Sequence, residues 1–368
     1  MAGTRRTRTV GRPASPARIA PVRDFTGTAP RFAIEWDVRP SYDFLFSLSP
    51  DAGTTDDLPA EDRRWLRDAR TGLADAAKER VARATKDDLS IHLVGYLVDH
   101  PELRDARQAV EAMRADGHVA VLRHLFGDMS DSVGAIDPIV EQALDGDADA
   151  IATLRARYPA ASKHSTGADV LDDPEREFDG LMAVLDDWAT AFEQVQPRVT
   201  AIIQRDYDLR ADDRATLGGS DLVERTTSGI RLVPEPGVRR IILAPSYFSR
   251  PYNFLLGGPD WRLDGYPVAD AALELDPLAP PSAVLRLHRA LGDETRLRIL
   301  KLLADRDLYL TEIAELLELS KPTIKHHLAM LRAAGLLTVV EAGPVTYYHL
   351  RRERVDQASG DLRAFLAN

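Results

Sequence analysis

The sequence contains no cysteine in its 368 residues. This absence excludes disulfide bonds, thiolate metal sites and cysteine nucleophiles. The sequence also lacks a run of about 18 apolar residues and the apolar core of a secretory signal, so we expect no membrane contact and a cytoplasmic location. With 44% hydrophobic residues, the chain can still form substantial cores, enough for about two domains.

The familiar motifs of catalysis are missing as well. There is no Gly-x-x-x-x-Gly-Lys phosphate loop, no Gly-x-Ser-x-Gly nucleophile elbow and no His-Glu-x-x-His metal helix. His118 and His124 could approach Asp128, but their spacing does not place both histidines on one helical face. We therefore expect no catalytic residues, no metal and no cofactor, and a protein that is not an enzyme.

Negative charge is in excess but unevenly distributed. The whole chain carries a net charge of −11, whereas residues 284–354 hold 12 Lys and Arg against 9 Asp and Glu, a net charge of +3. The remainder is therefore at −14, and a polyanion would repel it. A second basic segment is the arm at residues 1–30, which we expect to be disordered; its arginines are Arg5, Arg6, Arg8, Arg12, Arg18 and Arg23.

Apolar periodicity predicts a mainly helical region after the arm. Residues 32–38 alternate as in a strand, and residues 41–48 are typical of a helix. Helical spacing recurs between residues 61 and 126, and one long helix is predicted from Asp173 to about Tyr207. Residues 229–234 and 239–245 then predict two strands, which we expect to form a hairpin.

An aromatic segment, residues 246–254, follows the predicted hairpin. Its aromatic side chains alternate with Arg250 and Asn253, which could line a pocket for a planar or anionic ligand. The pattern favours a packed loop that is anchored by its aromatic side chains. Prolines in residues 277–281 predict a stiff linker. We therefore expect an effector or interaction domain at residues 31–278, a linker at residues 279–282 and a second domain at residues 283–368.

The second domain begins with a series of helix signals. Asp293 can cap a helix that carries Leu297, Leu300 and Leu303 at core spacing. A second helix is predicted at residues 311–317, with its first threonine as the cap. The short segment 318–320 then predicts a tight turn between two helices.

A third helix starts at Ser320, which can cap it, with Pro322 in the first turn. Its apolar residues form one buried stripe, namely Ile324, Leu328 and Leu331. The opposite face carries short polar and cationic side chains, namely Lys321, Thr323, Lys325 and His326. Such side chains at a helix N-terminus suit the major groove of DNA, where they meet base edges and phosphates. His327 lies near the buried stripe, so it is either a packed residue or a phosphate ligand.

A β-hairpin is predicted after this helix. Gly335 is suited to end the helix, and residues 336–340 and 345–350 predict two strands around a turn-rich link. Tyr347 and Tyr348 alternate across a strand, so only one of them can face DNA. The arginines that follow can neutralise phosphate, namely Arg351, Arg352 and Arg354.

Together, these motifs resemble the winged helix-turn-helix of the ArsR-type, arsenic-repressor-like transcriptional regulators. The resemblance covers residues 282–352 and rests on the Gly292–Arg296 opening, the Leu319–Leu328 helix, the Gly335-Leu336 break and the Tyr347-Tyr348 strand. It implies a homodimer, joined through residues 284–291 and 362–366, on a partly palindromic double-stranded DNA operator. The DNA-binding candidates are Ser320, Lys321, Thr323, Lys325, His326, His327, Tyr347, Arg351 and Arg352.

The sequence lacks the ligands of two metal-sensing sites that are known in that family. The paired cysteines that sense soft metals are absent, and the tail from residue 351 onward offers Glu353, Asp356 and Asp361 without a histidine. If the protein responds to a ligand, we therefore expect a small-molecule effector instead of a thiolate-bound metal.

The sequence thus predicts a mostly helical α+β fold, with a large N-terminal domain followed by a C-terminal winged helix-turn-helix. The predicted function is a sequence-specific DNA-binding transcriptional regulator. Two alternatives stay open. The N-terminal domain could be an enzyme fused to an autoregulatory DNA-binding module, or a protein-contact platform in a constitutive regulator.

Overall fold

We describe the protein from a computed structural model. The described residues are 32–49, 52–53, 57–86, 89–129, 138–157, 166–232, 237–273, 280–342 and 345–367. The basic arm expected at residues 1–30 lies outside them, as do residues 277–279 of the proline-rich segment.

The fold is α+β and mostly helical, as the sequence predicted. In the N-terminal region, residues 32–273, the 3-10 helices among the described residues are η1 (Arg123–Met129) and η3 (Asp270–Ala272). Its α-helices among the described residues are α1 (Pro40–Leu48), α2 (Ala60–Gly72), α3 (Asp75–Lys86), α4 (Leu89–His92), α5 (Val94–Asp99), α6 (Ala106–Leu122), α7 (Ile139–Leu144), α8 (Ala148–Arg157), α9 (Thr166–Asp172), α10 (Pro174–Phe192), α11 (Gln196–Leu209), α12 (Ala211–Thr216) and α13 (Gly219–Thr226).

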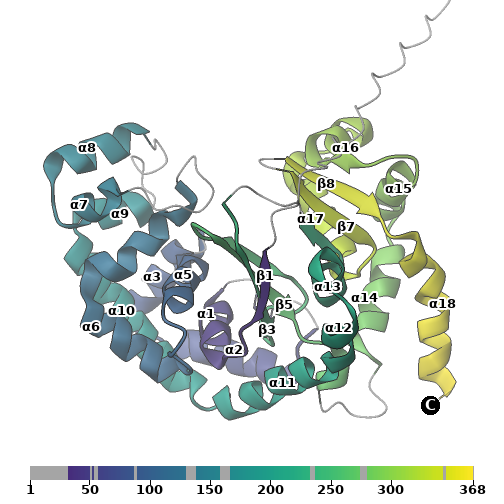
Figure 1. The fold of residues 1–368 in the computed structure, drawn as a ribbon, viewed down its shortest axis with the longest axis horizontal. Coiled ribbons are helices and arrows are strands. Elements are labelled where there is room, and N and C mark those ends of the chain that lie inside the picture. Colours follow the sequence, from purple (N-terminus) through teal and green to yellow (C-terminus); the bar gives the residue numbers. More distant parts are fainter. Residues whose placement is uncertain are drawn as a thin grey trace, which may run out of the picture.

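A four-stranded sheet runs through the N-terminal region. Its strands are β1 (Ala33–Trp36), β3 (Arg240–Ser246), β5 (Trp261–Pro267) and β4 (Phe254–Gly257), in that spatial order, and only β4 is antiparallel to its neighbour. Successive residues of β3 face opposite sides of the sheet. Ile242 and Ala244 join the large helical core, whereas Ile241 and Leu243 pack with Val223 of α13 in a smaller cluster. Helices therefore cover both faces of the sheet (Figure 1).

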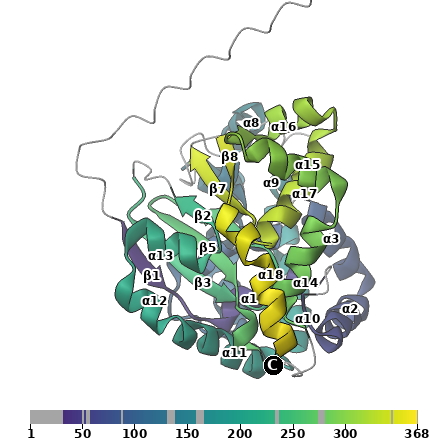
Figure 2. The same cartoon turned by 90° about the vertical axis from the view of Figure 1, so that its right-hand side faces the viewer.

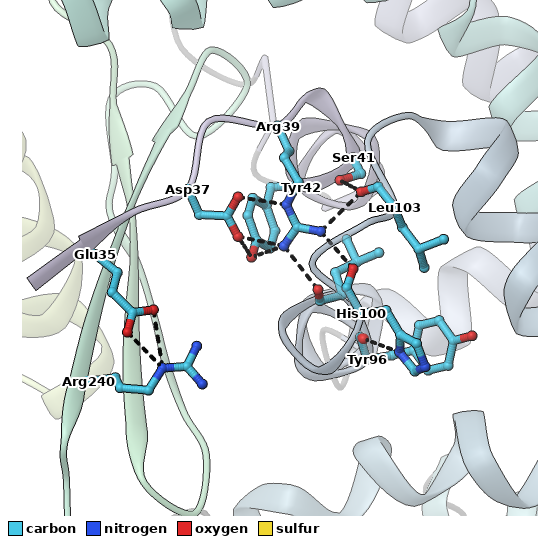
Figure 3. Close-up of polar contacts among 10 residues, drawn as sticks. Glu35, Asp37, Arg39, Ser41, Tyr42, Tyr96, His100, Leu103 and Arg240 are labelled. Atoms are coloured by element: carbon cyan, nitrogen blue, oxygen red, sulfur yellow. Dashed lines mark hydrogen bonds and ion pairs between the residues drawn. The ribbon is translucent and has the colours of Figure 1, made fainter. Parts of the chain in front are cut away.

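A buried arginine joins β1 and α1 to the helical layer (Figure 3). Arg39 is 1% exposed, and its Nε donates to Asp37 at 2.7 Å. Its two Nη atoms donate to the backbone carbonyls of Leu97, His100 and Leu103 at 2.9–3.0 Å. A buried guanidinium is stable only when its donors are satisfied. These contacts make Arg39 a structural clamp between the start of α1 and the end of α5.

The long helix predicted from Asp173 to Tyr207 is wrong in one respect, because the structure breaks it into α10 and α11. Asp173 caps α10 as a carboxylate that accepts a hydrogen bond from the Arg176 amide at 3.2 Å. Pro197 lies in the first turn of α11 and has no N–H, so it could not continue a helix by bonding back to Glu193. The second helix therefore starts anew at Gln196.

The C-terminal module, residues 280–367, lies on one side of the central sheet, and helices α6 to α10 lie on the opposite side (Figure 1). Its elements are α14 (Ser282–Leu291), α15 (Glu294–Leu303), β6 (Leu308–Tyr309), α16 (Leu310–Leu317), α17 (Lys321–Ala333), β7 (Leu337–Ala342), β8 (Val345–Leu350) and α18 (Arg352–Ala367). They share one apolar core, to which Leu287, Ile299, Ile313 and Leu328 contribute. The predicted helix-turn-helix and hairpin are therefore present.

Two local expectations for this module were wrong. Leu297 is 48% exposed and not in the core, because Arg296 takes the buried position beside it. Thr311 does not cap α16, which begins one residue earlier with Tyr309 as its N-cap. The Glu312 carboxylate accepts a hydrogen bond from the Tyr309 amide at 3.2 Å, which fixes the start of the helix.

The hairpin predicted from residues 229–234 and 239–245 is also wrong. The first segment forms β2 (Ile230–Leu232), which pairs in parallel with β7 of the C-terminal module, whereas the second forms β3 and pairs with β1 and β5. The second sheet therefore has the order β2-β7-β8-β6, and its first strand comes from the N-terminal region. Figure 2 shows β2 beside β7 and β8. The two parts of the chain thus share a sheet.

Candidate DNA-binding interface

The geometry of α17 follows from its first residues. The Ser320 hydroxyl accepts a hydrogen bond from the Thr323 amide at 3.3 Å and lies 2.7 Å from the Thr323 hydroxyl. Pro322 occupies the first turn, where a missing N–H costs no hydrogen bond. Glu318, with φ of +56°, turns the chain sharply between α16 and α17. A capped helix N-terminus is therefore presented next to a tight turn, as in a helix-turn-helix.

One face of α17 holds the helix in the module. Ile324, Leu328 and Leu331 are at most 1% exposed, as their spacing predicted. The candidate contact residues on the other face are all exposed, namely Lys321, Thr323, Lys325 and His326. The structure thus leaves these four side chains exposed to solvent in the first two turns of the helix.

His327 lies apart from this surface. Its side chain is 15% exposed, and its Nδ1 lies 3.8 Å from the carboxylate of Asp293, the N-cap of α15. Burial lowers the pKa of the His327 imidazole, so the ring is neutral at neutral pH. The packed position of this histidine corresponds to the first of the two interpretations that the sequence left open.

The two tyrosines of β8 point in different directions. Tyr348 packs against the core of the module, whereas the Tyr347 ring meets the Tyr309 ring edge-on with centroids 6.3 Å apart. The pairing of β8 with β6 places Tyr347 opposite Tyr309. Tyr347 is therefore held beside the start of α16.

The arginines after the hairpin make contacts within the chain. Arg351 donates to the backbone carbonyl of Ser228 at 2.9 Å and to Glu353 at 3.2 Å. Arg352 donates to the carbonyl of Ala304. Arg351 also lies near Gly335, at the C-terminal end of α17. The structure thus does not bring Arg351 together with the exposed residues at the N-terminal end of α17.

Sequence reasoning missed the role of Arg296. This side chain is 8% exposed and donates to the carbonyls of Ala290 and Arg289 at 2.9 and 2.6 Å, at the end of α14. It also lies 3.3 Å from the Met330 sulfur of α17. Arg296 therefore fixes α14 relative to α17. Its position in the Gly292–Arg296 motif was the sequence feature that could have indicated this role.

The aromatic segment at residues 246–254 is packed, as the sequence favoured. Tyr247, Phe248 and Arg250 are at most 2% exposed. The Arg250 guanidinium pairs with Asp270 and donates to the carbonyls of Asp57 and Val268. These bonds use the polar groups of the segment to anchor it in the protein.

Neither a membrane segment nor a metal cluster is found among the described residues. No helix in these ranges is long and apolar enough to cross a membrane. No group of three or more His, Asp or Glu side chains in the same ranges is arranged to hold a metal ion.

Comparison with known proteins identifies the C-terminal module. Residues 293–339 match the family model described as "Bacterial regulatory protein, arsR family". The chain is 38% identical over 74 residues to the HTH-type transcriptional regulator KmtR of Mycobacterium tuberculosis, a match that covers 20% of this chain and 57% of KmtR. It is also 38% identical over 81 residues to the HTH-type transcriptional regulator CmtR of Mycobacterium bovis, covering 22% of this chain and 69% of CmtR.

Two further proteins are similar to part of this chain. The arsenic resistance transcriptional regulator ArsR1 of Pseudomonas putida is 40% identical over 77 residues, which cover 21% of this chain and 57% of ArsR1. The solved structure of HlyU from Vibrio cholerae is 30% identical, with a TM-score of 0.20, and covers 23% of this chain and 94% of HlyU. The chain thus spans little more than half the length of KmtR and ArsR1. Through its C-terminal module, the chain belongs to the ArsR family of bacterial regulatory proteins.

Proposed function

We propose that the protein is a sequence-specific transcriptional regulator that binds double-stranded DNA as a homodimer. The observation that carries this proposal is the exposed polar and cationic surface at the capped N-terminus of α17. A helix in this position can enter the major groove with its first residues at the base edges. The net charge of +3 on residues 284–354, against −14 on the remainder, favours contact through this module.

Each residue of the interface has a proposed role. Lys321 and Lys325 bind phosphate or the acceptor atoms of guanine, and Thr323 and His326 contact base edges. Ser320 caps the helix, Tyr347 lies on strand β8 of the wing, and Arg352 follows the wing as the first residue of α18. We leave His327 and Arg351 out of the contact set, because the first packs against α15 and the second bonds to Ser228.

The proposed dimer contact lies on α18. Val355, Leu362 and Leu366 are 37%, 37% and 73% exposed, and their spacing of seven and four residues places them on one face of the helix. A second copy of this helix would bury that stripe. Replacement of Leu366 with glutamate should then yield monomers in light scattering. The same change at Leu209, a leucine of α11 that is 54% exposed, should leave the dimer intact.

We further propose that residues 31–278 act as a sensor domain, joined by the linker at residues 279–282 to the DNA-binding domain at residues 283–368. The shared sheet of β2 and β7 supports this coupling, because a shift in the N-terminal region would move the wing. An effector regulates such a protein when it binds two conformations unequally. In a dimer, this would change the spacing of the two α17 helices, which must fit half-sites roughly 34 Å apart.

Fluorescence anisotropy with the DNA upstream of the protein's own gene tests the function. If the two lysines on each α17 bind phosphate, they alone supply four phosphate contacts per dimer, so affinity should fall at least about a hundredfold between about 50 and about 200 mM salt. Binding should also survive an excess of unrelated DNA. Equal displacement by any DNA would contradict a sequence-specific regulator.

A further inference from the structure

A cavity of about 520 Å³ lies between the N-terminal region and the C-terminal module. The N-terminal side comes from α11, α12, α13 and the residues just before β2. The other side comes from α14, the C-terminal end of α17 and the start of α18. Five arginines from both sides line it, namely Arg210, Arg225, Arg286, Arg351 and Arg354. This volume is in the range of pockets that hold small molecules, which often lie between domains.

The lining is rich in arginine, and each of the five arginines is also paired with an acid. Its carboxylates are Asp206 and Asp213, so five guanidinium groups face two acids. Asp206 accepts from Arg210 at 2.8 Å, and Asp213 lies 3.6 Å from Arg225. The acids that pair with the other three arginines stand outside the lining; they are Asp57, Glu353 and Asp361.

Several donors in the cavity wall can still serve a ligand. A guanidinium carries five N–H donors, and the contacts above occupy only part of each set. The Arg225 side chain, for example, is 68% exposed, so its remaining donors are open to a ligand.

We propose that this cavity is the effector site and that it binds a small organic anion with a carboxylate or phosphate group. Arginine is suited to this chemistry because its planar donors match both groups in a bidentate manner. The role as an effector site rests on the proposed function as a DNA-binding regulator, whereas binding of the anion does not depend on it.

The position of the cavity explains how binding reaches the DNA interface. Ala334 and Gly335, at the end of α17, form part of its wall, and so does Ser228, which precedes β2. The Ser228 carbonyl already accepts a bond from Arg351. A ligand that contacts both Arg225 of the N-terminal region and Arg354 of the module therefore changes the position of α17 relative to the N-terminal region. The ratio of the ligand's affinities for the two positions of α17 sets the size of the change in DNA affinity.

Isothermal titration calorimetry on the full chain tests the site, with citrate as the carboxylate probe and pyrophosphate as the phosphate probe. Sodium chloride at equal ionic strength is the blank. The variant is Arg225→Gln, whose side chain is 68% exposed, and the control is Arg176→Gln on α10, whose side chain is 66% exposed. Loss of one charge-assisted contact should weaken binding about tenfold in Arg225→Gln, and Arg176→Gln should bind as the unaltered protein does.

The two probes distinguish the ligand class, because binding of only one identifies the group that the cavity accepts. Absence of binding by both probes, or equal binding by the two variants, would overturn the proposal. A second titration follows DNA affinity by anisotropy with the bound probe. A change in affinity that Arg225→Gln removes supports regulation through this site. If the probe binds but the protein never binds specific DNA, the site stands and the proposed function fails.

Discussion

Replacement of Gly229 with alanine tests whether β2 joins the two parts of the chain. Gly229 has φ of +120°, and a Cβ atom there would lie 2.8 Å from the backbone oxygen of Leu337. The Gly229 carbonyl accepts a hydrogen bond from the Val339 amide at 2.9 Å, just before the paired residues of β2 and β7. A methyl group at this position would therefore push β7 away from β2. We call this pairing of β2 with β7 the seam between the N-terminal region and the module.

The expected loss of stability has two parts. A non-glycine residue at this φ costs about 1 to 3 kcal/mol. Separation of β2 from β7 loses backbone hydrogen bonds worth about 1 kcal/mol each, so the total should reach about 3 to 5 kcal/mol. Gly146 is the matched control, because its φ is +91° and an added Cβ would meet no atom within 4 Å. Gly146→Ala should therefore lose only the first part.

Urea denaturation of both variants measures this difference as a change in the free energy of unfolding. We expect Gly229→Ala to be less stable than Gly146→Ala by about 2 kcal/mol, the share that comes from the seam. Limited proteolysis should also separate the N-terminal region from the module more readily in Gly229→Ala. Equal losses in the two variants would refute the argument that β2 and β7 contribute to holding the two parts together.

Three further changes probe the cores and the helix cap. Asp43 is fully buried and accepts from the Ser246 hydroxyl and the Tyr247 and Phe248 amides; burial raises the pKa of its carboxyl to about 6. Because this folded pKa lies above the unfolded one, its stabilising contribution is present at low pH and lost as pH rises through about 6. The unfolding free energy of the unaltered protein, relative to Asp43→Asn, should therefore fall by about 2 kcal/mol from about pH 4.5 to about pH 7.5, and a flat difference would contradict the assignment. Leu328→Ala should cost about 2 to 5 kcal/mol in urea denaturation, since this side chain is 1% exposed. Ser320→Ala should cost about 1 kcal/mol in the same assay, and no loss would argue against its role as the cap of α17.

The C-terminal module could be predicted closely because its signals are local. Asp293, Ser320, Pro322 and Gly335 act on the backbone within a few residues, and the structure uses them as caps, first-turn residues and helix ends. The buried stripe of α17 likewise follows from helical periodicity alone. The exposed residues that we propose for DNA binding are those of α17 that lie outside this buried stripe.

The pairing of β2 and β3 could not be predicted in this way. Both segments have the residues of strands, and their closeness in sequence favoured a hairpin. Alternation identifies a strand and its faces but not its partner, and here the partner of β2 lies more than 100 residues further along the chain. The contact between β2 and β7 and the cavity beside it depend on this long-range pairing, so local sequence patterns could not predict them. Local spacing also failed to predict the exposure of Leu297. Helical periodicity alone does not show that Arg296 is buried and that Leu297 is exposed.

The central claim is that α17 binds DNA through its exposed N-terminal residues. The most direct test compares the operator affinity of Lys325→Ala with that of Lys78→Ala, a change at an exposed lysine of α3 in the N-terminal region. The account predicts that Lys325→Ala weakens binding about tenfold or more and reduces the salt slope by about 2, because a dimer loses two phosphate contacts, while Lys78→Ala changes neither. Unchanged affinity and salt slope in Lys325→Ala would contradict it.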